Sequence, residues 1–237
     1  MKFSCLIFSL AGCCLAAFAQ TASVTLPGIR AIPQVRAGGV DLSFPAPAGD
    51  FVEVGDRLRT TIFELMAPSF NRLLAAYAPA KTIIDLNERK TTGGLDLYAL
   101  VEVMRQAEYA DCTQQAFEEM LKGAEASMGA FVTENVGQLE EEMNIRLKSL
   151  GTKPIEVGRP EMLGGVFRKT DAAGFAMLVA IKQNDRSVTM AGAFAMVRVK
   201  QRLIYAYLFR RYESPDTVRW LRKNLDVWAD AIVARNE

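Results

Sequence analysis

The last third of the chain contains four strand-like segments, and the connections between them are too short for a parallel crossover. The segments cover residues 155–168, 174–182, 187–200 and 203–212, and residues 183–186 and 200–202 are expected to form turns. A parallel connection needs about a dozen residues or more, usually as a helix, whereas a tight turn joins antiparallel neighbours. We therefore expect these segments to form antiparallel pairs.

Apolar side chains alternate along the last two of these segments. One face of the third carries Val188, Met190, Phe194 and Met196, and one face of the fourth carries Leu203, Tyr205, Tyr207 and Phe209. Successive side chains of a strand point to opposite faces, so each set lies on one side of the sheet. We expect helices to cover that side, and we interpret the tyrosines as core residues rather than as a stacking platform for nucleic-acid bases.

The chain closes with an amphipathic helix that begins at Ser214-Pro215-Asp216. The serine hydroxyl can accept a hydrogen bond from a free N–H of the first turn, proline lacks that donor, and aspartate is favoured near the positive helix end. An apolar stripe follows at helical spacing, formed by Val218, Leu221, Leu225, Trp228 and Ile232. This helix is expected to pack on the sheet.

The longest helical pattern runs from Thr113 to Leu150. Asp111 or Thr113 can cap its first turn. The apolar stripe shifts phase near Gly129 and Gly137, and this shift predicts a kink or two consecutive helices.

Shorter patterns precede this helix. Residues 56–66 have apolar side chains at helical spacing and predict a helix, whereas residues 80–94 are charged, end in Thr-Thr-Gly-Gly and predict a loop. Strands are expected at residues 40–44, 51–54, 71–77 and 95–106. The last of these is apolar on both faces, which is typical of a central strand.

Together these patterns predict an α+β fold. A mostly antiparallel sheet of about six or seven strands is covered by helices, with the long helical segment between strands and the C-terminal helix packed on the sheet. Residues 20–39 are rich in proline and glycine and are expected to be an extended lead-in. Residues 40–237 are expected to form a single domain.

The first nineteen residues have the pattern of a bacterial export signal. Lys2 precedes an apolar run from Phe3 to Phe18, and Ala17-Phe18-Ala19 is an A-x-A cleavage site. We predict that residues 1–19 are a signal peptide and that the mature protein is periplasmic or secreted, without a transmembrane segment. Residues 10–13, Leu-Ala-Gly-Cys, also match a lipobox. The alternative is therefore a lipoprotein anchored in the envelope through Cys13.

The composition excludes several classes of function. The chain has no histidine, which rules out a Ser-His-Asp triad and a histidine-ligated zinc site. The 28 basic and 27 acidic residues balance, so no excess charge recruits nucleic acid. Three of the four cysteines lie in the signal, and Cys112 is expected to be buried without a disulfide partner in its own chain. No phosphate-binding loop is present, and no cofactor or metal is predicted.

Five basic residues form a candidate patch for an anionic partner, and they are Arg198, Lys200, Arg202, Arg210 and Arg211. They flank the last predicted strand. The alternative interpretation is that they occupy the solvated ends of strands and helices. No catalytic residue is predicted, although Asp96 and Glu102 of the expected central strand are the carboxylates available for general acid–base chemistry.

Two stretches resemble known proteins. LIYAYLFRRYESPDTVRWLRKNLDVWADAIVARN at residues 203–236 and FPAPAGDFVEV at residues 44–54 look like the arrangement in uncharacterised exported proteobacterial proteins. More distantly, the order of elements is similar to the PsbP-type α/β/α sandwich, in which an opening hairpin and antiparallel strands are covered by helices. The resemblance implies an accessory or assembly role, and it supplies no catalytic residue.

We therefore expect an exported, non-enzymatic protein that binds or helps assemble another envelope component, with an envelope protein as its partner and no nucleic acid. Two alternatives stay open. The first is a carrier of a small apolar ligand, which requires a cavity between the sheet and the long helix. The second is a carboxylate-dependent hydrolase.

Overall fold

An eight-stranded antiparallel sheet forms the centre of the computed structural model, which describes residues 34–88, 95–149, 153–183 and 186–237. Its strands, in spatial order, are β3 (Phe51–Glu53), β4 (Asn71–Pro79), β5 (Leu97–Met104), β10 (Arg202–Arg211), β9 (Arg186–Val199), β8 (Ala172–Gln183) and β6 (Glu156–Val157), and β7 (Glu161–Arg168) also pairs with β8. Every pair is antiparallel, and β5 is central. The predicted antiparallel α+β class is confirmed.

The sheet has more strands than the six or seven expected. The segment at residues 155–168 was expected to be one strand, but it forms β6 and β7, which pair with successive parts of β8. Gly158 and Pro160 lie between them, and a proline cannot donate a ladder hydrogen bond. The Gly158 N–H still reaches the Ala180 carbonyl at 2.7 Å, so the chain stays at the edge of β8 between the two strands.

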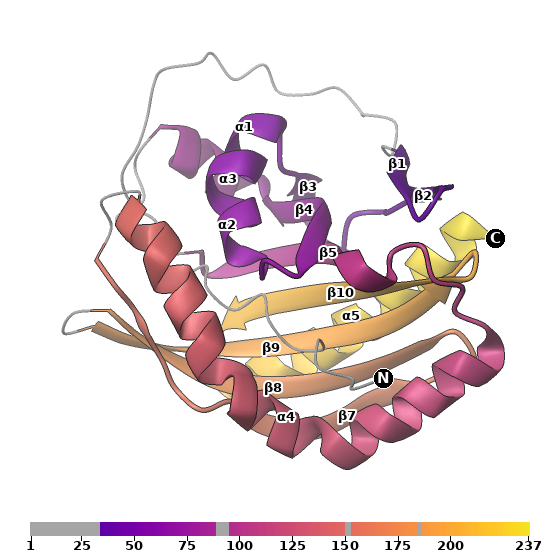
Figure 1. The fold of residues 1–237 in the computed structure, drawn as a ribbon. Helices are drawn as coiled ribbons and strands as arrows, with labels where there is room; N and C mark the ends of the chain where they lie inside the picture. Colours follow the sequence, from indigo (N-terminus) through magenta and orange to yellow (C-terminus); the bar gives the residue numbers. More distant parts are fainter. Residues whose placement is uncertain (1–33, 89–94, 150–152, 184–185) are drawn as a thin grey trace.

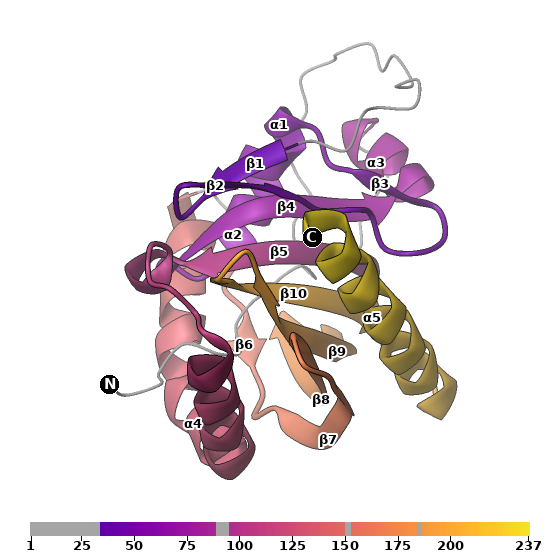
Figure 2. The ribbon, with the colours of Figure 1, turned by 90° about the vertical axis from the view of Figure 1, so that its right-hand side faces the viewer.

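Helices cover both faces of this sheet (Figures 1 and 2). The long helix α4 (Gln114–Ser149) lies on one side and α5 (Pro215–Asn236) on the other. The side of α4 also carries α1 (Asp56–Leu58), the π-helical turn η2 (Arg59–Phe63), α2 (Glu64–Met66) and α3 (Ala80–Asn87), and a 3₁₀ turn η3 (Arg105–Ala107) follows β5. Figure 1 shows that α4 changes direction along its length, as the shift of its apolar stripe predicted.

A row of aromatic rings fills the core on the α4 side. Phe175 stacks on Phe194 with ring centroids 5.4 Å apart, and the row continues through Tyr207 to Phe209, which stacks on Tyr98 at 4.9 Å. These rings come from β8, β9, β10 and β5 in spatial order. The two apolar strand faces predicted from the sequence therefore lie in one core, and the tyrosines are buried as expected.

The opposite face is lined by alanines, which let α5 approach the sheet closely. Ala191, Ala193 and Ala195 of β9 are fully buried there, beside Leu221, Leu225, Trp228 and Ile232 of α5. The helix begins as predicted, because the Ser214 hydroxyl accepts a hydrogen bond from the Asp216 N–H. Within the described ranges, no helix combines the length and the apolar character needed to cross a bilayer.

A separate two-stranded hairpin packs at one end of the molecule. It consists of β1 (Gln34–Ala37) and β2 (Val40–Ser43), so the strand expected at residues 40–44 is present and is paired with the end of the predicted extended lead-in. The Ser43 N–H donates to Asn236 Oδ1 at 2.9 Å, and Asn236 Nδ2 donates to the Ser43 carbonyl at 2.8 Å. The hairpin is thereby joined to the last turn of α5.

The prediction of a loop at residues 80–94 is wrong for the first half of this segment, which forms α3. Ile83 and Leu86 of this helix pack against the core, and the Ala80 N–H donates to the Asp50 carbonyl at 3.2 Å. Burial of one apolar side thus outweighs the charged composition of this short segment. Residues 89–94 lie outside the described residues, as do the predicted signal peptide, the lipobox at Cys13 and the first part of the lead-in.

Candidate functional site

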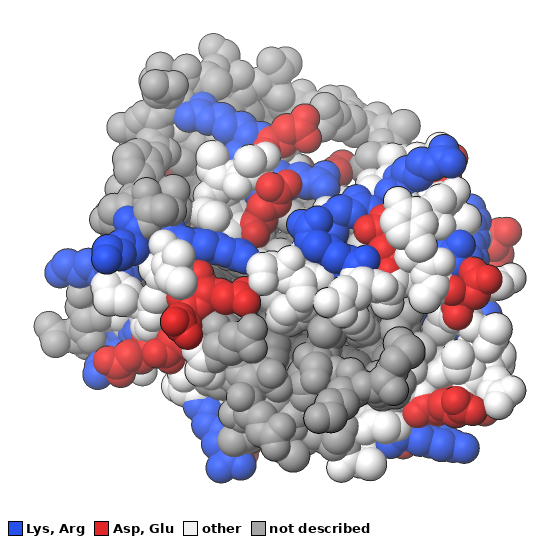
Figure 3. Space-filling model, viewed as in Figure 1, with Lys and Arg blue, Asp and Glu red and all other residues white. Residues whose placement is uncertain are grey.

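The structure divides the five basic candidates between the two ends of β10. Arg198, Lys200 and Arg202 lie at the β9–β10 turn, whereas Arg210 and Arg211 end the strand. Arg202 and Arg210 are eight positions apart along the strand, or about 26 Å at the usual rise. The five side chains therefore occupy two sites. Figure 3 shows basic and acidic side chains intermingled over the described part of one face.

The three cations at the turn end already have partners among the described residues. Arg198 pairs with Asp171, Lys200 Nζ donates to the Asp41 carbonyl at 3.0 Å, and Arg202 pairs with Asp111 and donates to the Gly38 carbonyl at 2.9 Å. These contacts join the β9–β10 turn to the β1–β2 hairpin and to the start of α4. They hold the three cations against other parts of the fold.

The turn itself has an unusual backbone. Lys200 and Gln201 both have positive φ angles, 45° and 57°, in a two-residue hairpin that ordinarily favours Asn-Gly. The left-handed region is strained for such residues. Contacts on both sides hold them there, since the Cys112 N–H donates to the Gln201 carbonyl at 2.8 Å. Neighbouring elements thus determine the shape of this end.

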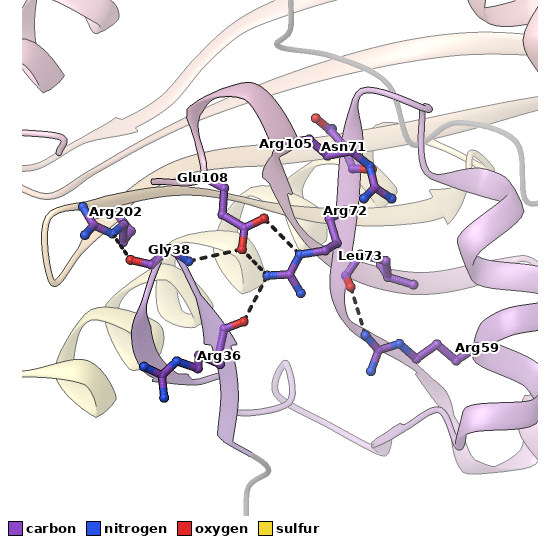
Figure 4. A network of polar contacts seen from close by, with 9 residues as sticks. All are labelled: Arg36, Gly38, Arg59, Asn71, Arg72, Leu73, Arg105, Glu108 and Arg202. Carbon is purple, nitrogen blue, oxygen red and sulfur yellow. Dashed lines mark hydrogen bonds and ion pairs between the residues drawn. The ribbon is translucent and has the colours of Figure 1, made fainter. Parts of the chain in front are cut away.

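Glu108 is the centre of a polar network at the same end (Figure 4). Its carboxylate accepts hydrogen bonds from Arg72 Nε at 3.1 Å, from Arg72 Nη2 at 2.5 Å and from the Gly38 N–H at 3.2 Å. Arg72 Nη2 also donates to the Arg36 carbonyl at 3.0 Å. The Arg72 hydrogen bond, helped by the Gly38 N–H, holds the pKa of Glu108 below its usual value although burial opposes this. The network joins β1, β4 and the segment after η3.

Replacing this carboxylate makes stability less dependent on pH. A group whose pKa is lowered by folding stabilises the protein above its unfolded pKa, and this contribution is lost as the pH falls through the folded pKa. We expect Glu108→Gln to reduce the free energy of unfolding by about 1–2 kcal/mol at pH 7. Between pH 6 and pH 3, urea denaturation should show a smaller loss for the variant than for the native protein. Glu125→Gln, at the exposed pair with Arg168, is the control and should change stability by less than about 0.5 kcal/mol. Equal effects of the two substitutions would contradict the assigned role of Glu108.

Cys112 lies beside this network and is 5% exposed, which confirms the predicted burial. Burial raises the pKa of its thiol to about 11 because the thiolate loses its hydration. At pH 8 a rise of about two pKa units lowers the thiolate population about 100-fold. The side chain therefore behaves as a small apolar group.

We expect the native Cys112 thiol to react at least about 100-fold more slowly than the unfolded one with a thiolate-directed reagent at pH 8. Stopped-flow or colorimetric thiol titration measures both rates, in a variant in which Cys5, Cys13 and Cys14 are serine. Rapid labelling of the native protein, without any loss of its folded circular dichroism signal, would show that the thiol is accessible.

The other end of β10 contains a pocket of about 480 Å³. Its walls are formed by the end of β10, the start of β5, the segment that leads into β3 and two residues of α5. Its charged and aromatic residues are Asp50, Phe51, Asp96, Arg210, Arg211, Glu213 and Trp220. The structure thus brings together two of the predicted basic candidates and one predicted carboxylate. It places the other three basic candidates elsewhere.

Arg210 and Arg211 have different surroundings in this pocket. The Arg210 guanidinium lies over the Trp220 ring, 5.0 Å from its centroid, and among the described residues no carboxylate pairs with it. Arg211 Nη1 lies 3.8 Å from Asp96 Oδ1, and the backbone N–H of Arg211 donates a hydrogen bond to the Asp96 carbonyl at 2.7 Å. Both partners of the Arg211 pair are exposed, so that pair contributes little to stability. Arg210 is therefore the pocket cation that lacks a carboxylate partner among the described residues.

The two candidate carboxylates do not form a pair. Asp96 lies at the rim of the pocket, whereas Glu102 is fully buried and accepts a hydrogen bond from Asn71 Nδ2 at 2.7 Å. They are six positions apart, about 20 Å along the strand. Paired carboxylate chemistry needs the two groups on one substrate, and these two do not meet. Within the described residues, no group of three or more acidic or cysteine side chains is placed to hold a metal.

Sequence reasoning missed Trp220, Asp50 and Glu213. Trp220 does carry a signal, because it lies off the buried stripe of an amphipathic helix, where a large aromatic residue needs a reason to be present. Asp50 and Glu213 carry no such signal in the sequence, because each is one of many charged residues outside the helices and strands. The pocket arises only when the fold brings these distant segments together.

Comparison with known proteins gives only distant structural likenesses. No family model and no curated protein matches the chain. Solved structures that are similar include cyanobacterial PsbP (CyanoP) from Synechocystis, with a TM-score of 0.36, 11% identity, and coverage of 86% of this chain and 95% of that chain. The Ran-binding protein Mog1p of Saccharomyces cerevisiae has a TM-score of 0.29 and 11% identity, over 85% of this chain and 94% of that one. These likenesses therefore include a PsbP structure, and they do not bear on the resemblance to exported proteobacterial proteins.

Proposed function

We propose that the chain is exported to the periplasm and binds a segment of another envelope protein, or helps to assemble it, without catalysing a reaction. The pocket at the end of β10 is the observation that carries this proposal. Helices cover both sheet faces, and the cations at the opposite end are used inside the fold. The pocket instead offers Arg210 and the Trp220 ring to a ligand.

A position-specific crosslinking experiment tests this proposal. A photoreactive amino acid replaces Arg211 at the rim of the pocket, and in the control it replaces Lys182, an exposed residue of β8, which lies two strands away from β10. We expect one discrete crosslinked envelope protein from the Arg211 position and not from Lys182. If both positions give the same products, or if neither captures a partner in intact cells, the proposed function is wrong.

The proposed location has its own measurement. Mass spectrometry of the protein purified from its native host should find a chain that begins at Gln20, because cleavage after Ala19 is expected. A lipid-modified Cys13 would instead show that the protein is tethered to the envelope. An uncleaved chain in the cytosol would contradict the export proposal.

The two alternative functions have less support. The carrier hypothesis needs a cavity beneath α4, and the side chains of residues 127–136 in that helix lie outside the described residues, so it stays a prediction. The hydrolase hypothesis named Asp96 or Glu102 as a carboxylate in perturbed surroundings within a pocket; the Asp96 side chain is 66% exposed at the pocket rim, and Glu102 is fully buried and bonded to Asn71. The pocket at Arg210 therefore favours binding.

A further inference from the structure

The charges around the pocket point to the chemistry of its partner. The residues that line the pocket include two arginines, Arg210 and Arg211, and three acidic residues, Asp50, Asp96 and Glu213. We propose that the pocket binds a mixed-charge peptide segment, in which one carboxylate pairs with Arg210 and a neighbouring basic side chain lies among the pocket carboxylates. This inference rests on the proposed function, because it specifies which segment of a partner the pocket accepts.

Arg210 is suited to a carboxylate because of how it is held. Its guanidinium carbon lies over the indole of Trp220, 5.0 Å from the ring centroid. Stacking on an aromatic ring occupies a face of the guanidinium and leaves the N–H groups at its edge available. Those groups match the two oxygens of a carboxylate, and this paired geometry gives the strongest of the common side-chain hydrogen bonds. A carboxylate is thus the ligand group that Arg210 lacks within the described residues.

The surrounding carboxylates restrict what else the ligand can carry. Three negative charges line the same pocket as Arg210, so a ligand with several anionic groups is repelled by some of them. Nucleic acid, an anionic lipid surface and a poly-acidic segment are all disfavoured for this reason. A basic side chain beside the ligand carboxylate instead gains an opposite charge. This selectivity modifies the expectation that Arg210 and Arg211 serve a purely anionic partner.

The open rim favours a peptide over a small molecule. Sites for small ligands bury most of the ligand surface. At this pocket the side chains of Arg211 and Asp96 are 52% and 66% exposed, so a bound group can continue outward along the protein surface. A chain segment that places a few residues in the pocket and continues past the rim fits this shape.

Peptide binding to the full chain tests the inference directly. The probe is a fluorescein-labelled, amidated peptide with the core Lys-Glu-Lys, and fluorescence anisotropy follows its binding. We expect Arg210→Gln to weaken binding about 10- to 100-fold, which is the usual effect of losing a charged hydrogen-bond pair. Arg210→Lys keeps the positive charge but lacks the planar guanidinium. Its affinity for the probe should lie between that of the native protein and that of Arg210→Gln. Arg168→Gln, at an exposed ion pair near the β7–β8 turn, should leave binding unchanged.

Peptide variants supply the other half of the test. Replacing the central Glu of the probe with Gln should weaken binding to the native protein but not to Arg210→Gln, and a probe with the core Glu-Glu-Glu should bind more weakly than Lys-Glu-Lys. Absence of binding at millimolar probe, equal binding to Arg210→Gln, or preference for Glu-Glu-Glu or inorganic phosphate would each overturn the inference. If a partner crosslinks at position 211 and Arg210→Gln does not reduce that crosslink, the carboxylate inference fails while the proposed function stands.

Discussion

Trp228→Ala is expected to reduce the free energy of unfolding by about 3–5 kcal/mol, as truncation of a large buried aromatic residue does. Trp228 is 1% exposed in the core beneath α5, and its ring meets Tyr77 edge-on at 6.1 Å. Its Nε1 donates to the Pro45 carbonyl at 2.7 Å, and the Tyr77 hydroxyl donates to the Phe44 carbonyl at 2.6 Å. Removing the indole therefore leaves a cavity and an unpaired carbonyl where α5, β4 and residues 44–45 meet.

The chain offers a matched control for this substitution, because its two tryptophans lie on the same helix. Trp220 lines the pocket and is only partly buried, packed against the edge of the same core, so Trp220→Ala should cost about 1–2 kcal/mol, less than Trp228→Ala. Trp228→Phe keeps an aromatic ring but loses the N–H. Its loss of unfolding free energy should fall between those of Trp228→Ala and Trp220→Ala. Guanidinium denaturation followed by circular dichroism measures all three. Equal losses for the two alanine variants would contradict the assignment of one tryptophan to the core and the other to the site.

The parts of the fold that could be predicted are those whose signal is local. The Ser214-Pro215-Asp216 start of α5 and its apolar stripe depend on contacts within a few residues, and the structure confirms both. The short turns between β8, β9 and β10 likewise leave the chain no other pairing. Where one segment alone determines the outcome, sequence reasoning succeeds.

The errors occur where a partner distant in sequence decides the structure. The short helix α3 is stabilised by packing Ile83 and Leu86 on a core made by other segments, so its charged sequence was misread as a loop. The division into β6 and β7 depends on β8, which can pair with both. In each case the local composition was compatible with two structures, and long-range burial or pairing selected one.

The candidate site was only partly visible in the sequence for the same reason. Basic residues were identified at both ends of the last strand, but the sequence could not show that Arg198 is paired with Asp171 while Arg210 lies over Trp220. Nor could it place Asp50 beside them, about 160 residues earlier in the chain. The distinction between a cation used in folding and one available to a partner comes from the assembled sheet. One end of β10 therefore serves stability, and the other end is where we propose that a partner binds.

Gly38→Ala is the second substitution expected to have a large effect, about 2–5 kcal/mol lost from the free energy of unfolding. Gly38 has a φ of +57°, which strains any residue with a side chain, and an added Cβ would lie 2.1 Å from the Glu108 carbonyl oxygen and 2.5 Å from Arg202 Nε. The backbone must therefore shift. That shift weakens the hydrogen bonds from the Gly38 N–H to Glu108 and from Arg202 to the Gly38 carbonyl, which join the hairpin to the sheet.

A substitution at the neighbouring Gly39 is the control that separates the cost of backbone strain from the cost of a steric clash. Gly39 has a φ of +82°, but an added Cβ there meets nothing within 4 Å, so Gly39→Ala should cost only the strain of about 1–2 kcal/mol. Urea denaturation gives the two values, and limited proteolysis between residues 34 and 43 reports release of the hairpin. We expect faster cleavage for Gly38→Ala alone, because only that substitution breaks contacts with Glu108 and Arg202. Similar losses and similar cleavage rates for both variants would mean that the network around Glu108 does not hold the hairpin in place.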